Sequence, residues 1–88
     1  MFLLGQTVAT PGALRALEDA EQSPSMFIKR HADADWGDVD EHDKNANDQA
    51  LVQGDRLLSS YKTAKGVKIW IITEHDRSAT TILLPSEY

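Results

Sequence analysis

Acidic side chains are concentrated in one short stretch of the chain, and their spacing resembles that of a calcium-binding loop. Residues 33–48 hold seven Asp and Glu residues against a single lysine, and Asp recurs at alternate positions in DADWGDVDEHD. A calcium loop also needs a bidentate acid at its twelfth position. Counting from Asp33 places Lys44 there, and counting from Asp38 places Gln49 there. The pattern therefore predicts a solvated acidic surface and no metal site.

The histidines and one polar hairpin are the other groups that could do chemistry. Three histidines, which we expect to face solvent, are spread along the chain: His31, His42 and His75. None forms a His-x-x-x-His pair, and the chain has no cysteine to complete a metal site. Residues 74–78 contain an acid, a base and a hydroxyl, but neighbours on a hairpin tip do not converge on a dry pocket. We interpret them as a polar turn in which Asp76 bonds the backbone and pairs with Arg77.

These patterns predict no catalytic residue and no cofactor. A small metal-assisted hydrolase that uses His42, His75 and nearby acids remains an open alternative. It requires these groups to converge in a concave pocket with shifted pKa values.

The elements that would position these residues begin with a strand and two helices. A chain of 88 residues buries one hydrophobic core, so residues 1–88 form a single domain. An apolar run predicts a strand over Phe2 to Ala9. Thr10-Pro11 and Ser23-Pro24 each place an N-cap hydroxyl before a proline at the first helical position. They predict helices over 11–22 and from 24 to about 31.

A third helix and three strands complete the predicted order. The helix is expected over Asn45 to Val52, with Asp38 or Asp40 as its N-cap. Strands are expected over 56–62, 67–73 and 79–84, because these segments are rich in β-branched and aromatic residues and are separated by turn signals.

The predicted fold class is α+β. An N-terminal strand and three short helices precede a C-terminal three-stranded antiparallel meander, and the helices pack on one face of the sheet. The first strand is expected to join the edge or the centre of the meander. Trp70 is assigned to the core, whereas Trp36, inside the acidic segment, is left open between core and interface.

The charge balance limits the partners that the chain can have. The net charge is −5, and the excess lies in the acidic segment, so the protein would repel phosphate and we expect no direct nucleic-acid binding. The apolar start is interrupted at Gly5 and Gln6, which indicates neither a signal peptide nor a membrane span. With no cysteine in the chain, we expect a cytoplasmic protein.

We therefore predict a non-enzymatic interaction protein whose partner is a protein with a basic surface. The candidate binding residues come from the acidic segment and the polar hairpin: Asp33, Asp35, Trp36, Asp38, Asp40, Glu41, Asp43, His75, Asp76 and Arg77. A structural accessory protein that forms a homodimer through its sheet edge is a further open alternative.

Three stretches of the sequence resemble a known family. They are LGQTVATPGALRAL, RHxxxDWGDVDEHDKNANDQAL and RLLSSYKTAKGVKIWIITEHDRSATTILLPSEY, and together they cover nearly the whole chain. The family consists of small bacterial proteins often carried by plasmids and other mobile elements, and sometimes named plasmid-related or restriction-modification associated. The resemblance implies a cargo protein of mobile DNA. For such a protein we expect one of two roles, antagonism of a host defence system or support of DNA transfer. It implies no residue assignments.

Overall fold

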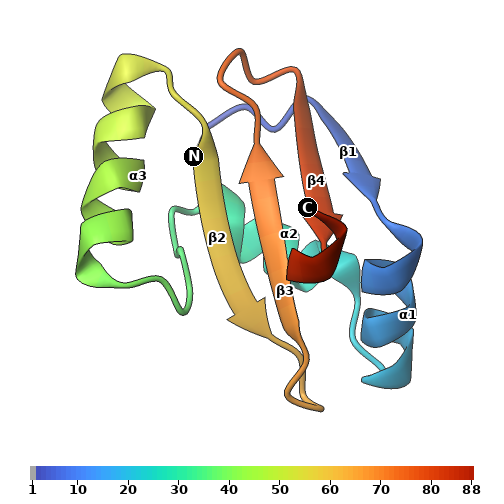
Figure 1. The fold of residues 1–88 in the computed structure, drawn as a ribbon. Coiled ribbons are helices and arrows are strands. Elements are labelled where there is room, and N and C mark those ends of the chain that lie inside the picture. The colour runs from blue at the N-terminus through green and yellow to red at the C-terminus, as the bar shows by residue number, and fades with distance from the viewer. Residues whose placement is uncertain (1) are drawn as a thin grey trace.

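The computed structural model describes residues 2–88, which form one four-stranded sheet, three α-helices and a final 3-10 turn (Figure 1). The strands are β1 (Gln6–Ala9), β2 (Leu57–Lys62), β3 (Lys68–Thr73) and β4 (Ala79–Leu83). The helices are α1 (Pro11–Asp19), α2 (Pro24–Ala32), α3 (Glu41–Gln53) and the turn η1 (Pro85–Glu87). Within residues 2–88, none of the helices has the length and apolar character that a membrane crossing requires.

The strand order in the sheet is β1-β4-β3-β2. Strands β2, β3 and β4 form the predicted antiparallel meander, whereas β1 pairs with β4 in parallel. The α+β class is confirmed, and the sheet as a whole is four-stranded and mixed, because β1 joins the edge of the predicted three-stranded meander in parallel. The parallel pairing arises because the chain crosses over through its helices between β1 and the meander.

Strand β1 is shorter than the predicted Phe2 to Ala9. Gly5 has a φ of 64°, so the extended backbone is interrupted there. Just before it, the backbone carbonyl of Leu4 accepts a hydrogen bond from the side chain of Thr80, at 2.7 Å. The residues before Gln6 therefore bond to the sheet through a side chain instead of through a strand ladder.

The predicted helix starts are confirmed. Thr10 Oγ1 accepts from the N–H of Ala13 at 3.3 Å, and Ser23 Oγ accepts from the N–H of Ser25 at 3.2 Å. Asp40 caps α3 by accepting from the Asp43 N–H at 2.8 Å. This helix begins at Glu41, four residues earlier than predicted.

Helix α1 ends at Asp19, before the predicted end at residue 22. Glu21 has a φ of 55°, which a right-handed helix cannot continue, and the Gln22 N–H donates to the Leu17 carbonyl at 2.9 Å. The side chain of Gln22 also accepts a hydrogen bond from the N–H of Ala64 at 2.8 Å. The chain therefore leaves the helix to contact the turn between β2 and β3.

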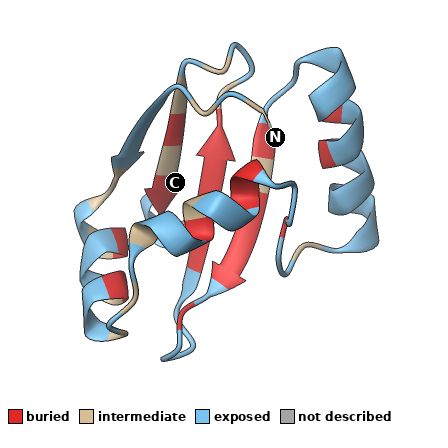
Figure 2. Cartoon of the chain, turned by 180° about the vertical axis from the view of Figure 1, so that it is seen from behind, coloured by how far each residue is buried: buried red, intermediate tan, exposed pale blue. Residues whose placement is uncertain are grey.

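The prediction that all three helices pack on one face of the sheet is wrong. Helices α1 and α2 cover one face of the sheet, and α3 lies along its edge beside β2 (Figures 1 and 2). The main core joins these two helices to the sheet: Ala13, Leu17, Phe27, Tyr61, Ile69, Ile71 and Ile82. A second cluster of Trp36, Ala50 and Leu57 attaches α3 to the edge.

Helix α3 and the segment before it cover the outer edge of β2. The side-chain amide of Asn47 donates to the Leu58 carbonyl at 2.7 Å, and its oxygen accepts from the Leu58 N–H at 3.1 Å. Two residues along the strand, the Ser60 N–H donates to the Trp36 carbonyl at 3.0 Å, and the Ser60 carbonyl accepts from the Asp38 N–H at 2.6 Å. The outward-facing backbone groups of Leu58 and Ser60 are therefore paired in the way that a neighbouring strand would pair them.

Replacing Asn47 by Ala is expected to lower the free energy of unfolding by about 1–3 kcal/mol. The change removes both hydrogen bonds and leaves the Leu58 backbone groups without their partner in a nearly buried site. Denaturant unfolding followed by tryptophan fluorescence measures the loss. Asn45→Ala, an exposed change on the same helix, is the control. Equal stabilities of the two variants would contradict the role given to Asn47.

Candidate acidic interface

The first two predicted carboxylates, Asp33 and Asp35, are paired with cations of α2. Lys29 Nζ lies 3.4 Å from the Asp33 carboxylate, and Arg30 Nε lies 2.8 Å from that of Asp35. The hydrogen bond from Arg30 lowers the pKa of the Asp35 carboxyl. The Arg30 guanidinium also lies 4.6 Å from the centre of the Tyr61 ring. These two positions therefore contribute little free negative charge.

Trp36 belongs to the core and is not an exposed interface anchor. Its side chain is 3% exposed, and its indole N–H donates to the Asp48 carboxylate at 3.2 Å. It stacks on Phe2 at 6.1 Å and meets His31 edge-on at 5.6 Å. Trp70, which was assigned to the core, is half-buried on the other face of the sheet, where it packs edge-on against Tyr88 at 5.8 Å.

Four predicted carboxylates remain exposed around the first turn of α3. We call them the acidic surface: Asp38, Asp40, Glu41 and Asp43. Among residues 2–88, none of the four forms an ion pair with lysine or arginine. Asp40, Glu41 and Asp43 also lie at the positive end of the helix dipole, where their negative charges stabilise the helix.

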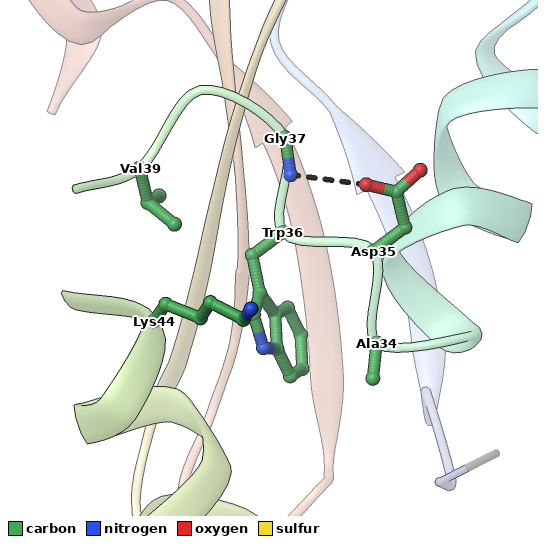
Figure 3. Close-up of a pocket in the computed structure, with 6 residues that line it drawn as sticks. All are labelled: Ala34, Asp35, Trp36, Gly37, Val39 and Lys44. Atoms are coloured by element: carbon green, nitrogen blue, oxygen red, sulfur yellow. Dashed lines mark hydrogen bonds between the residues drawn. The ribbon is translucent and has the colours of Figure 1, made fainter. Parts of the chain in front are cut away.

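A shallow pocket of about 280 Å³ lies beside the acidic surface (Figure 3). Its lining comes from the segment after α2 and from the first turns of α3: Ala34, Asp35, Trp36, Gly37, Val39 and Lys44. Lys44, on α3, and Trp36 line the same pocket. The pocket contains one acid and one base and neither of the histidines that a hydrolase would use.

The polar hairpin between β3 and β4 lies at the other end of α3. Asp76 accepts from the Ser78 N–H at 3.0 Å, as predicted, and the hydrogen bond from the Ser78 side chain is the main cause of the lowered pKa of Asp76. Arg77 does not pair with Asp76 as expected. It donates to the carbonyls of Ala50 at 3.2 Å and Asp55 at 2.7 Å, where a cation stabilises the last turn of α3.

The structure therefore does not bring the predicted binding residues together on one surface. His75, Asp76 and Arg77 lie near the C-terminal end of α3, and the acidic surface lies at its N-terminal end. A helix of 13 residues separates the two groups by about 20 Å. The hairpin and the acidic segment are two separate features.

No protein family, curated protein or solved structure matches the chain. The assignment of a function therefore depends on the geometry of the described residues.

The histidines do not converge. His42 lies in the first turn of α3, and exposed His75 lies in the hairpin at the opposite end of that helix. Within residues 2–88, no three His, Asp or Glu side chains are grouped so that they could hold a metal ion. The arrangement lacks the convergence that the hydrolase alternative requires.

The sequence-based prediction for His31 is also wrong: this side chain was expected to face solvent, and it is fully buried. Its Nδ1 is hydrogen-bonded to Ser59 Oγ and its Nε2 lies 2.8 Å from Thr73 Oγ1. Thr73 Oγ1 lies 2.8 Å from Thr80 Oγ1, which in turn donates to the Leu4 carbonyl. This chain of hydrogen bonds joins α2, three strands and the N-terminal segment.

The carbonyl at the end of this chain determines the direction of its hydrogen bonds. A carbonyl oxygen only accepts, so Thr80 donates to Leu4 and accepts from Thr73, which in turn accepts from His31 Nε2. The neutral imidazole then carries its proton on Nε2, and Nδ1 accepts from Ser59. Burial, with a smaller contribution from the charge of Arg77, lowers the pKa of His31 to about 4.

Proposed function

We propose that the chain is a small, non-enzymatic interaction protein of mobile-element type that presents its acidic surface to a protein partner with a basic surface. The observation that supports this most is the group of four exposed carboxylates at the start of α3, for which no lysine or arginine partner lies among residues 2–88. Proteins that act on nucleic acids carry basic surfaces, so a host defence complex of that kind is the partner class we favour.

The physical basis of the proposal is electrostatic attraction at close range. Four like charges around the start of α3 create a local negative potential that speeds encounter with a basic patch and disfavours acidic competitors. Each exposed charge contributes only about 0.2–1 kcal/mol, so the surface acts as a group. Binding through it should weaken as salt is raised, because exposed charges are screened.

The test is affinity capture from host lysate with a charge-neutralised variant. The triple change D38N/E41Q/D43N removes three charges and keeps Asp40, which caps α3. Recovery of the partner is expected to fall about tenfold, the effect of losing three weak charge contacts. The matched control E18Q/D19N/E21Q removes the same charge near the end of α1 and should leave recovery unchanged. Capture of the same partner by the acidic-surface variant, or of none by the wild type, would contradict the proposal.

A further inference from the structure

The two edges of the sheet differ in whether other parts of the chain cover their backbone groups. The outer edge of β2 is covered, because Asn47, Trp36 and Asp38 bond to its backbone. Strand β1 forms the opposite edge, and among residues 2–88 no strand lies on its outer side. Figure 2 shows β1 as an exposed strand at the rim of the sheet. An open edge of this kind is a template for pairing with another strand.

The register of β1 against β4 shows which backbone groups are available. The N–H groups of Gln6 and Thr10 donate to the carbonyls of Ser78 and Ile82, both at about 3 Å, so alternate residues from Gln6 face β4. The N–H and C=O groups of Thr7 and Ala9 therefore point away from the sheet. The edge offers two donors and two acceptors in alternation.

The chemistry of this edge favours a second copy of the same chain. Its sequence, QTVA, carries no charge, although the whole chain has a net charge of −5. The acidic surface lies beyond β2, at the far side of the sheet, about 24 Å from β1 across three strand spacings and a helix. Two acidic molecules can thus meet at β1 with their like-charged ends farthest apart.

We propose that β1 pairs antiparallel with β1 of a second copy, across a two-fold axis that passes beside Val8. In this register Thr7 lies opposite Ala9 of the second copy, and the two residues exchange both of their backbone hydrogen bonds. The symmetric pair repeats this, so four bonds hold the edge. The two Val8 side chains, each 42% exposed in the single chain, then face each other on the side of the sheet away from α1 and α2.

Cross-linking tests this register directly. The chain has no cysteine, so V8C introduces a single thiol. Residues opposite each other in a non-hydrogen-bonded antiparallel pair have Cα atoms about 4.5 Å apart, within the range that a disulfide spans. Under mild oxidation V8C should form a disulfide-linked dimer at least about tenfold faster than V52C, a control on α3 whose side chain is 88% exposed. Equal rates for the two variants would overturn the proposal.

Proline provides an independent test in solution. T7P removes a donor that faces outward, so β1–β4 pairing is retained while two of the four bonds between copies are lost. T7A keeps the donor and is the matched control. Sedimentation measurements up to about 1 mM protein should show that wild type and T7A dimerise, with a Kd at least about tenfold higher for T7P.

Two outcomes of the solution measurement would show that a second copy does not pair with β1. A wild type that stays monomeric over this range, or a T7P protein that dimerises as well as T7A, would overturn the second-copy proposal. Neither experiment depends on the acidic surface. Dimerisation would therefore persist in D38N/E41Q/D43N even if the proposed partner binding failed.

Discussion

Lowering the pH from 7 to 4 is expected to reduce the free energy of unfolding by about 3 kcal/mol through His31 alone. The pKa of this imidazole is about 4 in the folded chain, against an ordinary value of 6.5. As the pH falls below 6.5, the unfolded chain therefore takes up a proton that the folded chain does not. The contribution of His31 to stability is complete above pH 6.5 and is lost by about pH 4.

The surroundings of His31 explain why the neutral form is favoured. The ring lies between Phe2, at 5.2 Å, and Trp36, at 5.6 Å, and it has no solvent exposure. A cation placed there would lose its hydration, and the nearby charge of Arg77 would repel it. Within the described residues no carboxylate bonds to the ring, since both nitrogens are bonded to the hydroxyls of Ser59 and Thr73.

The measurement is urea unfolding of the wild type and of H31Q at several pH values between 7 and 4. Glutamine keeps a donor and an acceptor but cannot titrate, so the variant should be less stable at pH 7 and should lose the pH dependence that His31 causes. Asp35 and Asp76, whose pKa values are lowered by bonds from Arg30 and Ser78, affect both proteins equally and mostly below this range. Parallel pH profiles for the two proteins would show that His31 is not the titrating group.

Local signals in the sequence predicted the elements well, because the interactions that start and stop them are local. Thr10, Ser23 and Asp40 each bond to a backbone N–H two or three residues ahead, and such spacing is visible in the sequence. The parallel partner of β1 lies more than 70 residues away, and no local pattern specifies it. The position of α3 at the edge likewise depends on Asn47 finding the backbone of β2.

The sequence contains a signal for the buried hydrogen-bond chain of His31 and Ser59. His31 follows Phe27 by four residues, which places both on the buried face of α2. Ser59 lies between apolar Leu57 and Tyr61 on the core-facing side of β2. A hydroxyl at such a position needs a buried partner, and a histidine on a buried helix face can supply it. The partner could not be chosen from sequence because it depends on how α2 crosses the sheet.

The sequence also overestimated the number of unpaired carboxylates in the acidic segment, because two of them pair with cations of α2. Lys29 and Asp33 are four residues apart on one helix, a spacing at which opposite charges pair. Arg30 reaches Asp35 only because the chain turns back after α2, where Ala34 adopts a φ of 63°. The predicted carboxylates of the acidic segment without a lysine or arginine partner among residues 2–88 are therefore those of the acidic surface at the start of α3. The proposed binding surface is smaller than the sequence indicated, so fewer substitutions are needed to test it.

Replacing Gly37 by Ala is expected to lower the free energy of unfolding by about 2–5 kcal/mol. Gly37 has a φ of 73°, and its backbone passes directly beside β2, where it forms an isolated bridge with Ser60. An added Cβ would overlap the Ser60 carbonyl oxygen and lie 2.6 Å from Cδ1 of the Tyr61 ring. Both groups are held in the sheet and the core, so neither can move without breaking other contacts.

Gly66→Ala separates the two causes of this loss, which are the backbone strain at a positive φ and the overlap of the added Cβ with β2. Gly66 has a φ of 79°, but nothing lies within 4 Å of its added Cβ, so only the backbone strain of about 1–2 kcal/mol should appear. Urea unfolding of both variants, followed by tryptophan fluorescence, measures the difference that is due to the close approach of Gly37 to β2. Equal losses would mean that this approach does not occur in solution. A larger loss for Gly37→Ala would place the segment that carries Trp36 and Asp38 against β2, which is the contact that holds the acidic surface beside the sheet.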